Sequence, residues 1–259
     1  MINKIDEKVL IEIAQDAGKA ILEIYNSDDF GVEIKEDKSP LTAADKAAND
    51  VIVKGLEKHY PEIPILSEEM KEVEYEVRKN WEYFWLVDPL DGTKEFIKRN
   101  GEFTVNIALI HNGEPILGVI DLPVKTTTYF ARKGDNKCSY KVDKNGKSDI
   151  KVKPADGDTC IIMASRSHLN EETQNFVDEQ KKRFENIEFV SAGSSLKFCF
   201  IAEGKANMYP RFAPTMEWDT GAGQVIAECA GATVINKETG KPLQYNKENL
   251  LNPYFLVNT

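Results

Sequence analysis

Two aspartates three residues apart, Asp88 and Asp91, are the most chemically suggestive residues of this 259-residue chain. They follow an apolar segment, residues 84–87, which predicts a short buried strand. Pro89 cannot donate a hydrogen bond to a neighbouring strand, and Gly92 permits a turn that most residues resist. We therefore expect both carboxylates at a strand end, close together and facing a cleft. Neighbouring carboxylates repel each other unless a cation or a proton separates them. Oxygen ligands without a nearby His or Cys favour Mg²⁺ over Zn²⁺ as that cation.

The same segment has two other interpretations. Asp-Pro and Asp-Gly pairs are ordinary turn formers, and on this stretch alone a plain turn is about as well supported as a metal site. An aspartate loop of the haloacid dehalogenase kind is a competing functional interpretation. That loop needs Asp-x-Asp, whereas the spacing here is Asp-x-x-Asp, which counts against it.

Further blocks along the chain support the metal interpretation through a resemblance. Asp-Pro-Leu-Asp-Gly-Thr at 88–93 resembles the metal-binding motif of the lithium-sensitive, Mg²⁺-dependent phosphatases of the inositol monophosphatase superfamily. Four more blocks match in order, namely Ser-Pro-Leu-Thr-Ala-Ala-Asp at 39–45, Leu-Ser-Glu-Glu at 66–69, Gly-Ser-Ser-Leu-Lys-Phe at 193–198 and Trp-Asp-Thr-Gly-Ala-Gly at 218–223. Lys-Glu-Phe at 94–96, Ser-Arg-Ser-His at 165–168 and Tyr-Pro-Arg at 209–211 resemble the bisphosphate nucleotidase branch of that superfamily.

The resemblance implies roles for particular residues. The implied metal ligands are Glu68, Asp88, Asp91, Asp219 and the backbone carbonyl of Leu90. Asp45 and Thr93 would polarise the attacking water or position a further metal ion. The implied substrate contacts are Gly92, Thr93, His168, Ser194, Lys197, Arg211 and Asp219. Two or three Mg²⁺ ions are expected, because four carboxylates and a phosphate dianion carry about −6 and two ions offset only +4.

Most of these residues also have a simpler structural interpretation. Asp45 fits a capping box at the start of a helix, and Asp219 fits an N-cap or first-turn aspartate. Glu68 lies in a short acidic run of the kind usually found on a surface. Ser194 and Ser195 are interpreted first as a helix cap and Lys197 as a surface lysine, although backbone N–H groups at a helix start also attract phosphate.

The secondary structure expected around these residues is mixed. Helical spacing between Val9 and Ile24 predicts an amphipathic helix, and a second helix is expected from about Thr42 until Pro61. Strand-like segments at 103–110 and 115–122 flank Asn112-Gly113, a strong hairpin signal, and the polar stretch 133–153 reads as a loop or edge region. Further strands are expected near 127–131, 160–164, 189–190 and 207–209, and further helices from about 170, after 195 and over 219–229.

Hairpins in the first half and strand–helix alternation in the second support an α+β class. The resemblance implies a layered α/β/α/β/α architecture with the active site between two halves. We expect a single phosphatase unit over residues 1–259, with an N-terminal half at about 1–153 and a C-terminal half at about 154–259.

Composition limits the partners. The net charge of −10, from 33 basic and 43 acidic residues, argues against nonspecific nucleic-acid binding. No apolar run approaches a membrane span, and the N-terminus lacks the apolar block of a signal peptide.

The four cysteines have no C-x-x-C spacing, and Cys199 and Cys229 fall in apolar helical patterns, so we expect buried free thiols in a reducing cytoplasm. Loose association with the inner membrane surface and the oligomeric state stay open.

The resulting hypothesis is a Mg²⁺-dependent phosphomonoesterase with a small nucleotide as substrate. It would convert adenosine 3′,5′-bisphosphate to AMP and phosphate, in sulfate assimilation and nucleotide recycling. The 2′,5′ isomer and the sulfated nucleotide are further candidate substrates. One alternative is an inositol or sugar monophosphate phosphatase. A second is a noncatalytic Mg²⁺-dependent nucleotide sensor on the same scaffold.

Overall fold

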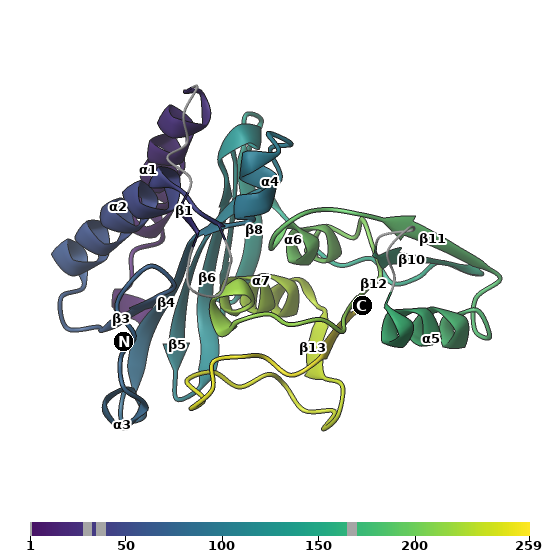
Figure 1. Ribbon diagram of the computed structural model, residues 1–259. Coiled ribbons are helices and arrows are strands. Elements are labelled where there is room, and N and C mark those ends of the chain that lie inside the picture. Colours follow the sequence, from purple (N-terminus) through teal and green to yellow (C-terminus); the bar gives the residue numbers. More distant parts are fainter. Residues whose placement is uncertain (1, 28–32, 35–39, 165–169) are drawn as a thin grey trace.

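Two β-sheets with helices between and outside them form the framework of the chain (Figure 1). The computed structural model describes residues 2–27, 33–34, 40–164 and 170–259. Its layers run from α1 and α2 through a seven-stranded sheet, α6 and α7, and a five-stranded sheet to α5. This order confirms the expected α+β class and the α/β/α/β/α layering.

Helices are interspersed among the strands along the described residues. The α-helices are α1 (Glu7–Tyr25), α2 (Ala43–His59), α3 (Tyr75–Arg78), α4 (Thr93–Ile97), α5 (Glu171–Gln180), α6 (Leu196–Ala202) and α7 (Gly221–Ala230). Single turns of 3-10 helix are η1 (Ile2–Lys4), η2 (Pro123–Lys125) and η3 (Glu217–Asp219). α1 begins after the N-cap Asp6, and α2 begins at a capping box formed by Thr42 and Asp45.

The seven-stranded sheet keeps its strands in chain order. They are β3 (Ile65–Ser67), β4 (Tyr83–Asp91), β5 (Thr104–His111), β6 (Glu114–Leu122), β7 (Thr127–Arg132), β8 (Cys138–Asp143) and β9 (Gly146–Asp149). β3 and β4 are parallel, and the remaining pairs are antiparallel. Asn112 and Gly113 have positive φ angles of 48° and 78°, as a two-residue hairpin turn requires, so β5 can reverse directly into β6.

The five-stranded sheet has a different topology. Its order is β11 (Asn186–Val190), β10 (Thr159–Met163), β12 (Met208–Arg211), β14 (Phe255–Asn258) and β13 (Thr233–Asn236). β10 is parallel to both β11 and β12, whereas β14 runs antiparallel between β12 and β13. A separate pair, β1 (Glu33–Ile34) and β2 (Pro40–Leu41), forms a two-stranded sheet.

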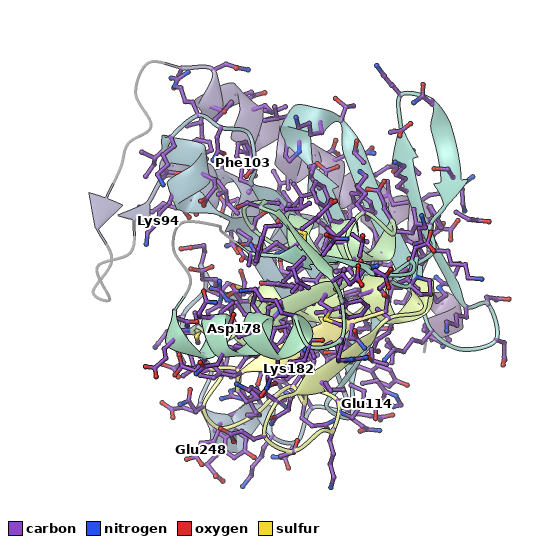
Figure 2. The ribbon with its side chains drawn as sticks, turned by 90° about the vertical axis from the view of Figure 1, so that its right-hand side faces the viewer. Lys94, Phe103, Glu114, Asp178, Lys182 and Glu248 are labelled. Carbon is purple, nitrogen blue, oxygen red and sulfur yellow. The ribbon has the colours of Figure 1, made fainter. Side chains whose placement is uncertain are left out.

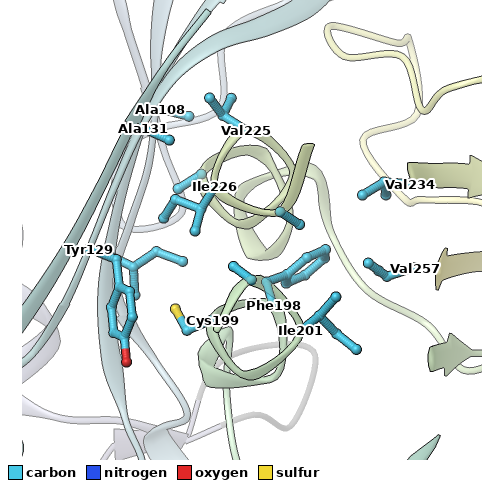
Figure 3. Close-up of a cluster of buried hydrophobic side chains, with 14 of the residues drawn as sticks. Ala108, Tyr129, Ala131, Phe198, Cys199, Ile201, Val225, Ile226, Val234 and Val257 are labelled. Atoms are coloured by element: carbon cyan, nitrogen blue, oxygen red, sulfur yellow. The ribbon is translucent and has the colours of Figure 1, made fainter. Parts of the chain in front are cut away.

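Both faces of the seven-stranded sheet are buried. Alternate residues such as Trp85 and Val87 pack under α1 and α2, while Leu86 and Ala108 face the helices between the sheets. Figure 3 shows the hydrophobic cluster between the two sheets, with Val225 and Ile226 of α7 against the seven-stranded sheet and Phe198 of α6 towards the five-stranded sheet.

Close approach of α7 to the sheet depends on a glycine. A Cβ added to Gly118 of β6 would lie 2.5 Å from the carbonyl oxygen of Ala222, so only glycine lets the strand and the helix backbone meet there. On the far side of the second sheet, α5 covers a smaller cluster that includes Cys160 and Val177. Figure 2 looks onto α5, where Asp178 and neighbouring Lys182 form part of its polar outer surface.

The structure confirms the two N-terminal helices and the hairpin, and it corrects several details. The 133–153 region holds β8 and the edge strand β9, so the loop interpretation was wrong and the edge interpretation was right. Strand β12 continues through Pro210, whose missing N–H does not prevent pairing with β14. The last helix starts at Gly221 and not at Asp219, and it ends at Gly231, which has a φ of 113°. The four cysteines are free thiols, but Cys138 and Cys229 are partly exposed and not buried as expected.

Candidate active site

A bulge in β4 sets the positions of Asp88 and Asp91. Asp88 pairs with Asn106 of β5, and Asp91 pairs with Thr104, so β4 holds one residue more than its partner between these points. The strand therefore does not stop at Asp88 as expected. It bulges at Pro89, where no ladder N–H is needed. Gly92, with a φ of 96°, then turns the chain into α4.

Two other elements bring carboxylates to the same place. Glu68 directly follows β3, and its N–H donates to the carbonyl of Val87 at 3.1 Å, which fixes it beside β4. Asp219 ends η3 and accepts a hydrogen bond from the Met216 N–H at 2.8 Å. It lies just before α7 and so is neither the N-cap nor a first-turn residue of that helix. A cavity of about 290 Å³ is lined by Glu68, Asp88, Leu90, Asp91, Gly92, Thr93, Lys94, Glu95 and Asp219.

The acids of this cavity raise one another's pKa values. Burial raises the pKa of Asp88 well above its ordinary value, and the charges of Glu68, Asp91, Asp219 and Asp45 raise it further. Burial and the charge of Asp91 raise the pKa of Asp219 to about 8. A cation would lower both pKa values by neutralising these charges.

The donors fit Mg²⁺ in chemistry, because they are carboxylate and carbonyl oxygens. In the described part of the chain, no three His, Cys, Asp or Glu side chains already form a compact metal cage. The fit to Mg²⁺ therefore rests on the oxygen donors that share one cavity and on their mutual repulsion.

Asp45 caps α2, as one of the two interpretations of the sequence predicted, and it also contacts Thr93. Its Oδ2 accepts from the Thr42 N–H at 2.7 Å and from the Thr42 hydroxyl at 2.6 Å, which closes the capping box of α2. Its Oδ1 lies 3.3 Å from the Thr93 hydroxyl, at the start of α4. Asp45 is 3% exposed. One buried carboxylate therefore contacts both the N-cap Thr42 of α2 and Thr93, which lines the cavity.

Ser195 and Lys197 differ from their simple interpretations. Ser195 is the N-cap of α6 but makes no side-chain cap hydrogen bond. Its hydroxyl lies 2.6 Å from Asp91 Oδ2 and 2.7 Å from the carbonyl oxygen of Asp219. Lys197 is not a surface lysine, because its Nζ donates to the carbonyls of Ala192 at 3.2 Å and Ser194 at 2.7 Å. Burial lowers the pKa of Lys197 to about 8, although the charge of Asp91 opposes this.

Arg211 lies on β12 across the cleft from the carboxylates. One of its terminal N–H groups donates to the carbonyl of Pro214 at 3.0 Å. Its Nε is buried and has no hydrogen-bond partner among the described residues. A buried donor without an acceptor is costly, so this atom is suited to an anionic ligand.

The carboxylates and these cationic groups line one continuous cleft. A second cavity of about 260 Å³ shares Asp91, Gly92, Glu95 and Asp219 with the first and also contains Ser194, Lys197 and Arg211. A third, of about 350 Å³, shares Lys197, Tyr209 and Arg211 with the second and adds Phe212 and Met163. His168, the remaining substrate contact expected from the sequence, lies outside the described residues.

Sequence reasoning missed one polar residue of the site. Asn106 is 1% exposed and donates to the Ser195 hydroxyl at 2.9 Å. The available signal was an asparagine in an otherwise apolar strand, β5, where a buried amide needs partners.

Comparisons with known proteins agree with this arrangement. A family model described as the inositol monophosphatase family matches residues 4–254. The chain is 47% identical to the 3′(2′),5′-bisphosphate nucleotidase CysQ of Escherichia coli strain K12, over 95% of this chain and 96% of that protein. It is 46% identical to the protein of the same name from Buchnera aphidicola of Acyrthosiphon pisum, over 95% of this chain and 90% of that one.

A solved structure is similar over almost the whole length. CysQ from Bacteroides thetaiotaomicron, described as a bacterial member of the inositol monophosphatase family, matches with a TM-score of 0.86 and 46% identity. The match covers 97% of this chain and 96% of that one.

Within the described residues, every helix is too short or too polar to cross a lipid bilayer.

Proposed function

The chain belongs to the inositol monophosphatase family, and from this premise we propose that it is a Mg²⁺-dependent 3′(2′),5′-bisphosphate nucleotidase. The reaction is hydrolysis of adenosine 3′,5′-bisphosphate to AMP and phosphate. The substantial identity to CysQ proteins along nearly the full chain supports this activity over that of the wider family.

The observation that carries the proposal is the division of charge along the cleft. The cavity at one end is lined by one lysine, Lys94, and by five acidic side chains, namely Glu68, Asp88, Asp91, Glu95 and Asp219. The next cavity shares three of these acids and adds the two cations Lys197 and Arg211. A bisphosphate needs two different anion sites, one where metal cations accept the phosphate to be cleaved and one where fixed cations hold the other. A simple monophosphate needs only the first.

Each part of the cleft has a role in this proposal. The four predicted carboxylate ligands and the Leu90 carbonyl would hold Mg²⁺, which supplies positive charge to the phosphate and makes water more acidic. Thr93 orients the attacking water and passes its proton towards Asp45 Oδ1, 3.3 Å from the Thr93 hydroxyl. Lys197 and Arg211 bind the phosphate that is retained. The third cavity, with Tyr209 and Phe212, accommodates the nucleoside.

The chemistry of the substrate suggests where it comes from. Transfer of a sulfo group from a 3′-phosphorylated adenylyl sulfate leaves adenosine 3′,5′-bisphosphate behind. The proposed enzyme would remove that by-product during sulfate assimilation and return AMP to the nucleotide pool.

Phosphate release from four substrates tests the proposal. Adenosine 3′,5′-bisphosphate, adenosine 2′,5′-bisphosphate, AMP and inositol 1-phosphate would be compared with Mg²⁺, and again after EDTA treatment. We expect the bisphosphates to react fastest, AMP to be stable, and EDTA to abolish turnover until Mg²⁺ is restored. Faster hydrolysis of inositol 1-phosphate would instead identify an inositol phosphatase. Nucleotide binding without turnover would identify a sensor.

A further inference from the structure

Asp91 differs from Asp88 and Asp219 because the hydrogen bonds to its side chain come from other side chains and not from backbone N–H groups. Both hydrogen bonds that its side chain accepts within the described residues end on Oδ2. One comes from the Ser195 hydroxyl at 2.6 Å, and a longer one comes from Asn106 Nδ2 at 3.4 Å. Oδ1 is thus left for another ligand.

Asn106, Ser195 and Asp91 form a short hydrogen-bonded relay, in which each residue donates to the next. Asn106 Nδ2 donates to the Ser195 oxygen at 2.9 Å, so the Ser195 hydroxyl hydrogen is turned away from Asn106. That hydrogen can go to Asp91 Oδ2 or to the Asp219 carbonyl oxygen, 2.7 Å away. A charged acceptor is the stronger of the two, which favours Asp91 while its carboxylate is ionised.

The relay also joins distant parts of the chain. Asn106 and Asp91 belong to neighbouring strands of the seven-stranded sheet, whereas Ser195 begins α6 and Asp219 ends η3. Asn106 is 1% exposed and Ser195 is 3% exposed, so water does not compete for these hydrogen bonds. One hydroxyl therefore sets the distance between a carboxylate of the first sheet and the backbone of the turn that carries Asp219.

We infer that Asn106 and Ser195 are positioning residues that hold Asp91 by Oδ2 and present Oδ1 to the metal. This inference rests on the proposed function, because it assigns a metal to that oxygen. Outer hydrogen-bond partners of this kind typically change metal affinity by about 10- to 100-fold when they are removed. Neither residue touches the substrate in this scheme, so both act through Asp91.

Calorimetric titration of Mg²⁺ into nucleotide-free protein tests the inference. Ser195→Ala and Asn106→Leu should each raise the Mg²⁺ dissociation constant about tenfold. The double variant should be little worse than the more affected single variant, because both changes release the same oxygen. In turnover assays the Mg²⁺ activation constant should rise while KM for the bisphosphate stays nearly constant, and excess Mg²⁺ should restore kcat.

Ser139→Ala is the matched control. The Ser139 hydroxyl is also buried and also links the first sheet to an inter-sheet helix, since it donates to the Ile226 carbonyl at 3.0 Å. Its loss should leave the Mg²⁺ dissociation constant within about twofold of wild type, as expected for an independent site. Urea unfolding in EDTA checks that every variant is folded.

The outcomes separate the two hypotheses. Wild-type protein that binds no Mg²⁺ would refute the metal-dependent proposed function itself. Wild-type protein that binds Mg²⁺, with folded Ser195→Ala and Asn106→Leu variants binding it equally well, would overturn only the positioning role. An effect of the same size in Ser139→Ala would also overturn it, by showing a general response to loss of packing.

Discussion

Glu217 and Asp219 lie two residues apart on η3, yet their surroundings are opposite. Glu217 is completely buried and accepts from the backbone N–H groups of Asn246 at 2.6 Å and Lys247 at 3.0 Å, and from Lys247 Nζ at 2.5 Å. Asp219 accepts one backbone hydrogen bond, and its charged neighbours include Asp91 and Glu68. Burial raises the pKa of both acids, but the donors around Glu217 oppose that rise, whereas Asp91 and Glu68 add to it at Asp219.

The difference extends to the basic residues. Lys247 is paired with Glu217, and the buried Arg78 donates to Asn246 Oδ1 and to the carbonyls of Lys247 and Glu248. In the cleft, Arg211 has a buried Nε without a partner in the described part of the chain. Charged groups in the Glu217 region pair with one another, whereas acids in the cleft lie beside further acids. A stability cost at a functional site is a common trade-off.

The largest effect is expected from Asp88→Asn. The substitution removes a carboxylate that burial and four acidic neighbours disfavour, while the amide oxygen can still accept from the Leu90 N–H. Activity with Mg²⁺ should fall on the order of a thousandfold or more, about 4 kcal/mol of barrier. Unfolding free energy in EDTA should rise, measured by urea denaturation. A destabilised Asp88→Asn would contradict the view that the cleft acids are under electrostatic strain.

Lys197→Ala and Arg211→Ala should show that the cationic end of the cleft serves the second phosphate. Each should lower kcat/KM for adenosine 3′,5′-bisphosphate by about 10- to 100-fold, because a charge-assisted contact contributes roughly 1.5–3 kcal/mol. Residual hydrolysis of a simple monophosphate should scarcely change. Lys205→Ala, which removes a half-exposed lysine paired with the largely buried Glu203, is the control. Equal losses on both substrate types would indicate a general structural role.

Glu217→Gln should act in the opposite sense to Asp88→Asn. It keeps the side-chain shape but weakens three hydrogen bonds, one of them to an ammonium. The unfolding free energy should fall by about 1.5–3 kcal/mol, with or without EDTA, as measured by urea denaturation. Turnover should persist at temperatures where the variant remains folded. A stability equal to that of wild type would remove the contrast between the two acids of η3.

The smallest effect is expected at Asp121. This buried acid lies outside the cleft and has few hydrogen-bond donors around it. It accepts from the Thr128 hydroxyl at 2.7 Å, and burial raises its pKa from 3.8 to about 7. The folded state therefore binds a proton that the unfolded state releases, so its contribution to stability is complete below pH 3.8 and is lost as pH rises through about 7.

The Asp121→Asn variant isolates this contribution. Relative to wild type, its unfolding free energy should increase by about 2 kcal/mol between pH 5 and pH 8. Urea denaturation of both proteins at the two pH values measures the difference. A constant difference across that range would show that donors or water compensate Asp121 better than its burial implies.

Local signals in the sequence predicted local structure well. The capping box at Thr42, the apolar spacing of α1 and the Asn112-Gly113 turn each act over a few residues, and the structure confirms all three. The extent of β4 through Pro89 was missed, because a proline in a bulge looks the same in sequence as a proline at a strand end.

Contacts between distant residues were not predictable in this way. Ser195 reaches Asp91 across 104 positions, and Lys197 shares a cavity with Asp91 and Asp219. Nothing in periodicity distinguishes Glu68 from Glu69, so the choice of Glu68 came from the family resemblance. The metal and substrate roles assigned to individual residues remain predictions.

Synthesis of the chain imposes an order on folding. All strands of the seven-stranded sheet have been made once residue 149 has emerged, whereas β14, which joins β12 to β13, is made only at Phe255–Asn258. Until α7 arrives, the face of the first sheet around Leu86 and Ala108 lacks its cover. A nascent chain of intermediate length would therefore expose an apolar sheet surface that chaperones recognise and that favours aggregation. Asp219 joins the other acids late, so we expect catalytic competence to appear only after the second sheet has closed.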